Sequence, residues 1–252
     1  MKKKLQNITD KSLPAIVILA LIILLEFLVD LNIIPKSIMP SPSMVFWALV
    51  KNGAEIGEKI LYTTQIGILG LFISFVIAFV FAILMDIFPR FEKAVYPLLV
   101  ISQTIPTIAI APLYVIWFGY GLTPKLLVII SVCFFPITIN LLEGFKSTDK
   151  DMVNLVKSMG SSQIKTFFLV KLPSSLGSLF SGLKIAATYC IMGAVVAEWL
   201  GGDKGIGVFM IRSKRTYSYE NMFAAIIVVI VLSILLNIVI SFFEKLLTPW
   251  KE

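Results

Sequence analysis

Apolar runs long enough to cross a bilayer alternate with short polar segments along this chain. A transmembrane helix needs about 20 predominantly apolar residues. On that basis we predict six spans, at residues 14–34, 61–88, 95–118, 122–142, 176–200 and 219–243. Ahead of the second span, a proline-rich segment at 35–43 cannot lie in a regular helix, and we expect a short amphipathic helix over 43–59 at the membrane surface. The pattern predicts an all-α polytopic membrane protein of one domain, residues 1–252.

One polar interval, residues 151–173, keeps a helical pattern of its own. Its apolar residues recur at i, i+3, i+4 and i+7, the spacing of one helix face: Met152, Leu155, Val156 and Met159. Gly160 readily ends a helix in a left-handed conformation, and either Ser161 or Ser162 can cap a second short helix. The apolar residues of that second helix are Ile164, Phe167 and Phe168. We therefore predict a helix–turn–helix, closed by Pro173, with an apolar stripe.

Composition supports the membrane assignment. The chain of 252 residues is 58% hydrophobic and 15% charged, with a mean hydropathy of +0.94, against about 45–50% apolar and 25% charged in soluble domains. The net charge of +7 is spread over short loops, which favours a topology signal over a nucleic-acid surface. The apolar run after the N-terminal lysines is long for a signal peptide and lacks a small-x-small cleavage site, so we interpret it as a retained first span.

The positive-inside bias predicts the orientation. More Lys and Arg residues fall on the side of the N-terminus than on the other side. The N-terminus, the C-terminus and the 151–173 interval are thus expected in the cytoplasm. The basic loop at 204–215, on the outer side in this arrangement, favours the opposite orientation.

The third predicted span holds Pro97, Pro106 and Pro112. Proline in a bilayer frees backbone carbonyls, which neighbours or the water of a cavity must satisfy. The prolines therefore indicate either a kinked helix along a solute pathway or a kink that only improves packing, and three together favour the pathway. The expected pathway-lining residues are Gln103, Thr104, Pro106 and Asn140.

The fifth span carries two faces of small residues: Gly182, Ala186, Cys190 and Ala194 on one, and Gly193, Ala197 and Gly201 on the other. Such faces let helices approach closely, either within one chain or at a dimer seam. In the same span Lys184 is expected to snorkel to the cytoplasmic interface. The acidic residues near span ends, Glu26, Asp30 and Glu198, are expected to reach water.

No arrangement of residues supports catalysis or metal binding. The sequence contains no histidine, and it has no G-x-x-x-x-G-K-[ST] motif for a nucleotide. Cys133 and Cys190 both lie in apolar runs, which indicates neither a disulfide framework nor a zinc site. We expect no catalytic residue, no metal and no cofactor in this chain. The apolar stripe of 151–173 instead indicates a protein interface, or a hairpin that lies flat on membrane lipid.

The 151–173 interval resembles the EAA loop of permease subunits of ATP-driven (ABC) importers. In that loop a glycine is followed, after nine residues, by an apolar residue, any residue, Leu and Pro, as in Gly160 and Val170-Lys171-Leu172-Pro173. The acidic-Ala-Ala start is here Asn154-Leu155-Val156. Further segments resemble the nitrate/sulfonate/taurine-type branch: Met39-Pro40-Ser41-Pro42-Ser43, Ile105-Pro106, Ala111-Pro112-Leu113, Trp117-Phe118-Gly119, Val196-Ala197-Glu198 and Gly205-Ile206-Gly207.

This resemblance implies a type I importer permease in a bacterial inner membrane. Two copies would form the pathway, a cytoplasmic ATPase dimer would bind ATP and Mg²⁺, and an extracytoplasmic binding protein would deliver the solute. The hairpin 144–173 would couple to the ATPase through Asn154, Leu155, Val156, Met159, Gly160, Ile164, Phe167, Leu172 and Pro173. The cargo implied is a small organic anion (sulfonate, taurine or nitrate-like), a thiamine-pathway pyrimidine or a similar vitamin.

Two other functions remain open at this point. A self-sufficient secondary transporter or channel would need ion-coupling residues deep in the membrane or inverted repeats, and the sequence offers neither. A membrane scaffold would only present the hairpin to a partner.

Overall fold

The computed structural model describes residues 2–249, and their side chains from Leu13 onward. Those residues form helices and no strand. Five helices are long and apolar enough to cross a membrane, and a bent pair makes a sixth candidate span. The prediction of an all-α protein with about six spans is confirmed. The chain divides into two compact units, Met1–Glu58 with Phe209–Val228 and Lys59–Val208 with Val229–Glu252, so a single domain stays a prediction.

The first unit contains α1 (Lys2–Asp30) and the start of α2 (Pro42–Ile87). The Glu26 carboxylate accepts hydrogen bonds from the Ser43 backbone N–H (2.9 Å) and hydroxyl (2.6 Å). It thereby places negative charge at the N-terminus of α2, where the helix dipole favours it. Glu26 is partly exposed, as predicted, and its carboxylate also serves as the cap of α2.

The short helix expected over 43–59 is present from Pro42 but ends earlier than expected, at a kink. It is the first part of α2, which has non-helical backbone angles at Asn52 (φ −107°, ψ 15°) and then runs on into the apolar span. The Asn52 side-chain amide donates to the Asn221 side-chain oxygen at 2.7 Å, near the start of α10 (Tyr219–Leu247). The short helix therefore ends at Asn52, and a second helix continues from it as the apolar span.

The basic segment expected to be a loop, 204–215, is also helical. It forms α9 (Ile206–Arg215), whose last turn carries Arg212, Lys214 and Arg215. Basic side chains are favourable at a helix C-terminus because they face the negative end of the helix dipole. The position of these basic residues is thus explained by the end of α9, independently of the orientation of the chain in the membrane.

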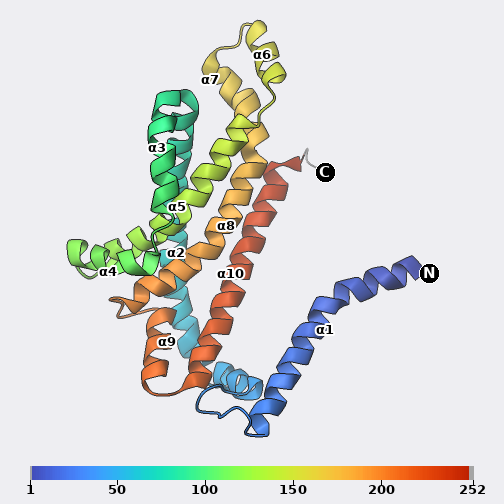
Figure 1. Ribbon diagram of the computed structural model, residues 1–252, viewed down its shortest axis with the longest axis vertical. Coiled ribbons are helices and arrows are strands. Elements are labelled where there is room, and N and C mark those ends of the chain that lie inside the picture. The colour runs from blue at the N-terminus through green and yellow to red at the C-terminus, as the bar shows by residue number, and fades with distance from the viewer. Residues whose placement is uncertain (1, 250–252) are drawn as a thin grey trace. The chain divides into compact units, whose positions relative to one another are not determined.

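The second unit is built around α5 (Leu122–Lys146) and α8 (Leu172–Trp199), which run side by side (Figure 1). A Cβ atom on Gly182 would lie 2.7 Å from the Pro136 carbonyl oxygen of α5, so the helices approach too closely for any side chain there. Ala186 and Cys190 on the same face are fully buried. Of the two explanations for the small residues, the structure shows packing within one chain.

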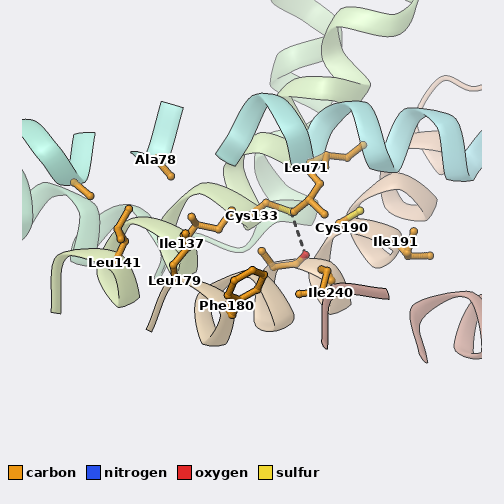
Figure 2. Close-up of a cluster of buried hydrophobic side chains, with 14 of the residues drawn as sticks. Leu71, Ala78, Cys133, Ile137, Leu141, Leu179, Phe180, Cys190, Ile191 and Ile240 are labelled. Atoms are coloured by element: carbon orange, nitrogen blue, oxygen red, sulfur yellow. Dashed lines mark hydrogen bonds between the residues drawn. The ribbon is translucent and has the colours of Figure 1, made fainter. Parts of the chain in front are cut away.

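Four helices contribute to the buried core of this unit (Figure 2). The labelled side chains come from α2, α5, α8 and α10: Leu71 and Ala78; Cys133, Ile137 and Leu141; Leu179, Phe180, Cys190 and Ile191; and Ile240. The Cys133 thiol donates to the Ala186 carbonyl at 3.3 Å. Both cysteines are free and buried.

The third predicted span is broken. It consists of α3 (Pro89–Ser102) and α4 (Thr107–Phe118), which meet at 102°, and Figure 1 shows α4 lying across the direction of α3. Pro106 immediately precedes α4, and a proline keeps the preceding residue out of helical backbone angles. The expectation of one kinked helix over 95–118 is therefore wrong. The Ile101 carbonyl at the break accepts hydrogen bonds from both the Thr104 N–H (3.0 Å) and the Thr104 hydroxyl (2.7 Å).

Candidate functional site

A helical hairpin connects α5 to α8. It comprises α6 (Lys150–Ser158), α7 (Gln163–Thr166) and a π-helical turn, η1 (Phe167–Lys171). The Asp149 carboxylate caps α6 by accepting from the Asp151 N–H at 2.8 Å, and Ser162, not Ser161, caps α7 by accepting from the Lys165 N–H at 3.3 Å. Gly160 lies between the helices at φ +82°. The predicted helix–turn–helix is present, with the turn at the predicted glycine.

The expected end of the hairpin at Pro173 is wrong, because the helix continues through it. Pro173 lies in the first turn of α8, directly after η1. A proline is tolerated in a first turn because its missing N–H has no partner to lose there. The hairpin is therefore joined to α8 by continuous helical backbone, so that a displacement of one can reach the other.

An apolar surface lies on the outside of the hairpin. We define the hairpin face as the exposed residues Met152, Leu155, Met159, Ile164 and Phe168, whose exposed fractions run from 56% to 78%. Phe167, predicted for this face, instead packs against Phe145 of α5 with ring centroids 5.3 Å apart. Leu172 likewise packs against the core. These two residues anchor the hairpin, while Phe168 contributes the exposed ring.

An ion pair fixes the base of the hairpin to α2. The Lys171 ammonium lies 2.8 and 2.7 Å from the two carboxylate oxygens of Asp86, and the Asp86 side chain is only 10% exposed. The pair borders a groove of about 420 Å³ between the end of α2 and the hairpin. Sequence reasoning missed this contact, since residues so far apart carry no periodic signal of their pairing.

A second groove, of about 420 Å³, lies in the second unit beside the break between α3 and α4. We call it the central groove. It brings together Gln103 and Asn140, both predicted to line the pathway, but Thr104 and Pro106 are not among its lining residues. The Asn140 amide donates to the Pro136 carbonyl at 2.8 Å. The pathway role of all four residues stays a prediction.

Glu198, expected to reach water, is 1% exposed, and that prediction is wrong. Its carboxyl oxygens accept from the Thr63 hydroxyl at 2.8 Å and from the Gly207 N–H at 2.7 Å. The Thr63 oxygen in turn accepts from the Ile206 N–H at 2.9 Å. Glu198 and Thr63 thus hold the first N–H groups of α9, which have no partner within the helix.

The glycines after Glu198 make this arrangement possible. Gly205 has φ +109°, and a Cβ atom there would lie 2.1 Å from the Glu198 carboxyl. The loop can therefore wrap around the carboxyl group only because this position has no side chain. The signal available from the sequence was an acidic residue in an apolar span followed closely by several glycines.

Lys184 forms an ion pair with Glu244 in the last turn of α10, because a lysine inside a span is stabilised by a carboxylate on a neighbouring helix. That Lys184 snorkels to the cytoplasmic interface stays a prediction. Two turns earlier in α10, the Asn237 amide donates to the Thr188 hydroxyl at 3.0 Å. Polar contacts therefore join α8 to α10 within the second unit.

The fold is that of an ABC transporter membrane subunit. A crystal structure of an amino acid ABC transporter with histidines superimposes with a TM-score of 0.65, covering 79% of this chain and 97% of that one. The sequence identity is 15%, so the likeness concerns the fold alone.

Sequence comparisons identify the family. Residues 70–252 match the model of the binding-protein-dependent transport system inner membrane component, and the chain belongs to this family of ABC transporter permeases. The formylaminopyrimidine transport permease protein of Halalkalibacterium halodurans is 37% identical over 85% of this chain and 86% of its own length. The riboflavin transport system permease protein of Chloroflexus aurantiacus is 28% identical (88% and 84%). The putative aliphatic sulfonates transport permease protein of Bacillus subtilis is 27% identical (95% and 86%). The resemblance seen in the sequence is confirmed.

Proposed function

We propose that this chain is the permease of an ATP-driven importer and that the hairpin face docks on a separate ATPase. The observation that carries the proposal is the hairpin face itself, which is apolar, exposed and anchored. An amphipathic helix that presents such a face is suited to a groove on a partner protein. Phe167 and Lys171 fix the base of the hairpin to α5 and α2, so that movement of the ATPase would reach the spans.

The assembly we propose has two copies of this chain, two ATPase subunits and an extracytoplasmic binding protein. The N- and C-termini and the hairpin face the cytoplasm, in agreement with the bias of Lys and Arg residues. ATP and Mg²⁺ bind the partner, not this chain. ATP hydrolysis can shift the permease between conformations only if the two states of the ATPase bind the hairpin face with different affinities.

The relatives support two classes of cargo. One class comprises sulfonates and related small anions, and the other comprises heterocyclic compounds such as pyrimidines and flavins. We propose a small polar solute from one of these classes.

Co-purification tests the docking proposal. Met159→Asp or Ile164→Asp would place a charge in the hairpin face and is expected to abolish capture of the partner ATPase. Ser158→Asp is the matched control, because Ser158 is exposed on the same hairpin but outside the face. Equal capture by all variants would refute docking through this face. Solute transport in liposomes by this chain alone would refute the ATP-driven importer and support a secondary transporter.

A further inference from the structure

The central groove is lined by polar and apolar side chains without charge. Its hydrogen-bonding groups belong to Ser102, Gln103, Thr107, Ser131, Asn140 and Tyr189. Phe135, Ile139 and Met192 are among its apolar walls. Within the described part of the chain, no Lys, Arg, Asp or Glu lines it. Its chemistry therefore consists of amides, hydroxyls and apolar side chains, including two aromatic rings.

Three lysines of the second unit are bound to other side chains. Lys184 pairs with Glu244, and Lys171 pairs with Asp86. Lys125 is 4% exposed and donates to the Tyr62 hydroxyl at 3.2 Å. Each of these three ammonium groups would have to leave its partner before it could balance a negative charge in the groove.

This distribution bears on the charge of the cargo. An anion that loses its water in a groove of low dielectric is strongly destabilised unless a cation or several aligned donors replace the water. Amides and hydroxyls, by contrast, both donate and accept hydrogen bonds, which suits a neutral solute with both kinds of group. The Tyr189 and Phe135 rings add apolar surface and ring faces for a planar solute.

We propose that the central groove takes an uncharged, hydrogen-bonding heterocycle and disfavours sulfonates and other small anions. The inference rests on the proposed function, since it assumes that this groove belongs to the solute pathway. A second copy related by two-fold symmetry contributes the same uncharged set. If two copies meet at this groove, the groove residues of the second copy therefore bring no positive charge to the first.

Cysteine modification tests the charge preference without knowledge of the cargo. Gln103→Cys and Ser131→Cys place reporters at exposed lining positions, while the native Cys133 and Cys190 are fully buried. The assembled transporter in membrane vesicles is treated with methanethiosulfonate reagents that carry an anionic, a neutral or a cationic headgroup. We expect the anionic-to-cationic rate ratio at both cysteines to lie within about threefold of the ratio for a free thiol, because no nearby charge biases the reagents.

The matched control adds a cation to the same groove. Gln103→Lys combined with Ser131→Cys should raise that ratio roughly tenfold, since a positive charge that lines the same groove attracts the anionic reagent and repels the cationic one. A tenfold preference for the anionic reagent without the added lysine would overturn the proposal.

Uptake separates this inference from the pathway assumption. Modification at position 103 or 131 should block ATP-dependent uptake of radiolabelled formylaminopyrimidine, and taurine should not compete with it. If neither cysteine reacts in the assembled transporter, or if complete modification leaves uptake intact, the groove is not the pathway and that part of the proposed function fails. If modification blocks uptake but anionic reagents are preferred, or taurine is the transported probe, only the uncharged class is refuted.

Discussion

Two substitutions of Glu198 test whether its hydrogen-bond acceptors or its charge stabilise the loop before α9. Glu198→Ala removes the acceptor of the Gly207 N–H, which is buried in the second unit. The Thr63 hydroxyl loses the same partner but can turn to the Lys59 carbonyl, already 3.2 Å away. One orphaned buried donor costs about 1–3 kcal/mol, and the lost side-chain packing adds about 1 kcal/mol or more. We expect a total destabilisation of about 2–4 kcal/mol.

Glu198→Gln should cost much less. Its amide oxygen can accept from the Gly207 N–H, and its NH₂ group can donate to the Thr63 oxygen while the Thr63 hydroxyl donates to the Lys59 carbonyl. Every donor of the native arrangement then keeps an acceptor, so we expect a loss below about 1 kcal/mol.

Thermal unfolding of the solubilised transporter, followed by fluorescence-detected size exclusion, measures both variants. About 1 kcal/mol corresponds to roughly 2–4 °C for chains of this size. We expect Glu198→Ala to lower the midpoint by about 4–16 °C and Glu198→Gln by less than about 4 °C. Equal losses in the two variants would refute the reasoning, because the charge and not the pattern of acceptors would then be what stabilises the loop.

A double-mutant cycle with Gly205 checks the same geometry. Gly205→Ala should destabilise strongly, since its Cβ would overlap the Glu198 carboxyl and its φ is +109°. In the Glu198→Ala background the overlap is gone and only the backbone strain remains, so the second substitution should cost less there than in the native chain. Additive losses would show that the two residues do not touch.

Three further predictions concern the hairpin. Asp86→Lys and Lys171→Asp should each lower ATP-dependent uptake and cost about 1–3 kcal/mol of stability, because Lys171 is partly exposed. The variant that carries both substitutions should recover part of the uptake and part of the thermal stability. No recovery would refute the ion pair as the connection between the hairpin and α2. Gly160→Val should uncouple ATP hydrolysis from uptake, because Gly160 has φ +82° and a β-branched residue rarely adopts this conformation. Gly160→Asn should have little effect on coupling, since asparagine tolerates this φ and nothing lies within 4 Å of an added Cβ. Equal coupling in the two variants would contradict a conformational role for Gly160. Ser161→Cys should be labelled by impermeant maleimide only from the cytoplasmic side, and labelling from outside would reverse the proposed topology.

The elements of the fold follow largely from local patterns in the sequence. Apolar length located the spans, and the spacing of Met152, Leu155 and Met159 with Gly160 located the hairpin. The motif around Gly160 and Pro173 also led to the family that the comparisons confirm. These features could be predicted because each depends on residues within one or two helical turns.

The contacts that position the sites could not be predicted in this way. Lys171 pairs with Asp86, Lys184 with Glu244 and Glu198 with Thr63, and each pair joins helices far apart in the chain. The exchange of Phe167 for Phe168 on the hairpin face has a different cause. A π-helical turn contains an extra residue relative to an α-helical turn. The side chains in it therefore point in directions that differ from those expected for a regular period of 3.6 residues.

The pairing of Lys184 with Glu244 has an electrical consequence. A single charge that crosses a membrane potential of 100 mV exchanges about 2.3 kcal/mol with the field, whereas an ion pair that moves as a unit exchanges almost none. Lys171 and Asp86 form a second such neutral unit. Rearrangement of these spans would then carry no gating charge through the pairs. With an uncharged cargo, neither the solute nor these two pairs would carry net charge across the membrane, so that uptake should continue in de-energised vesicles as long as ATP is supplied.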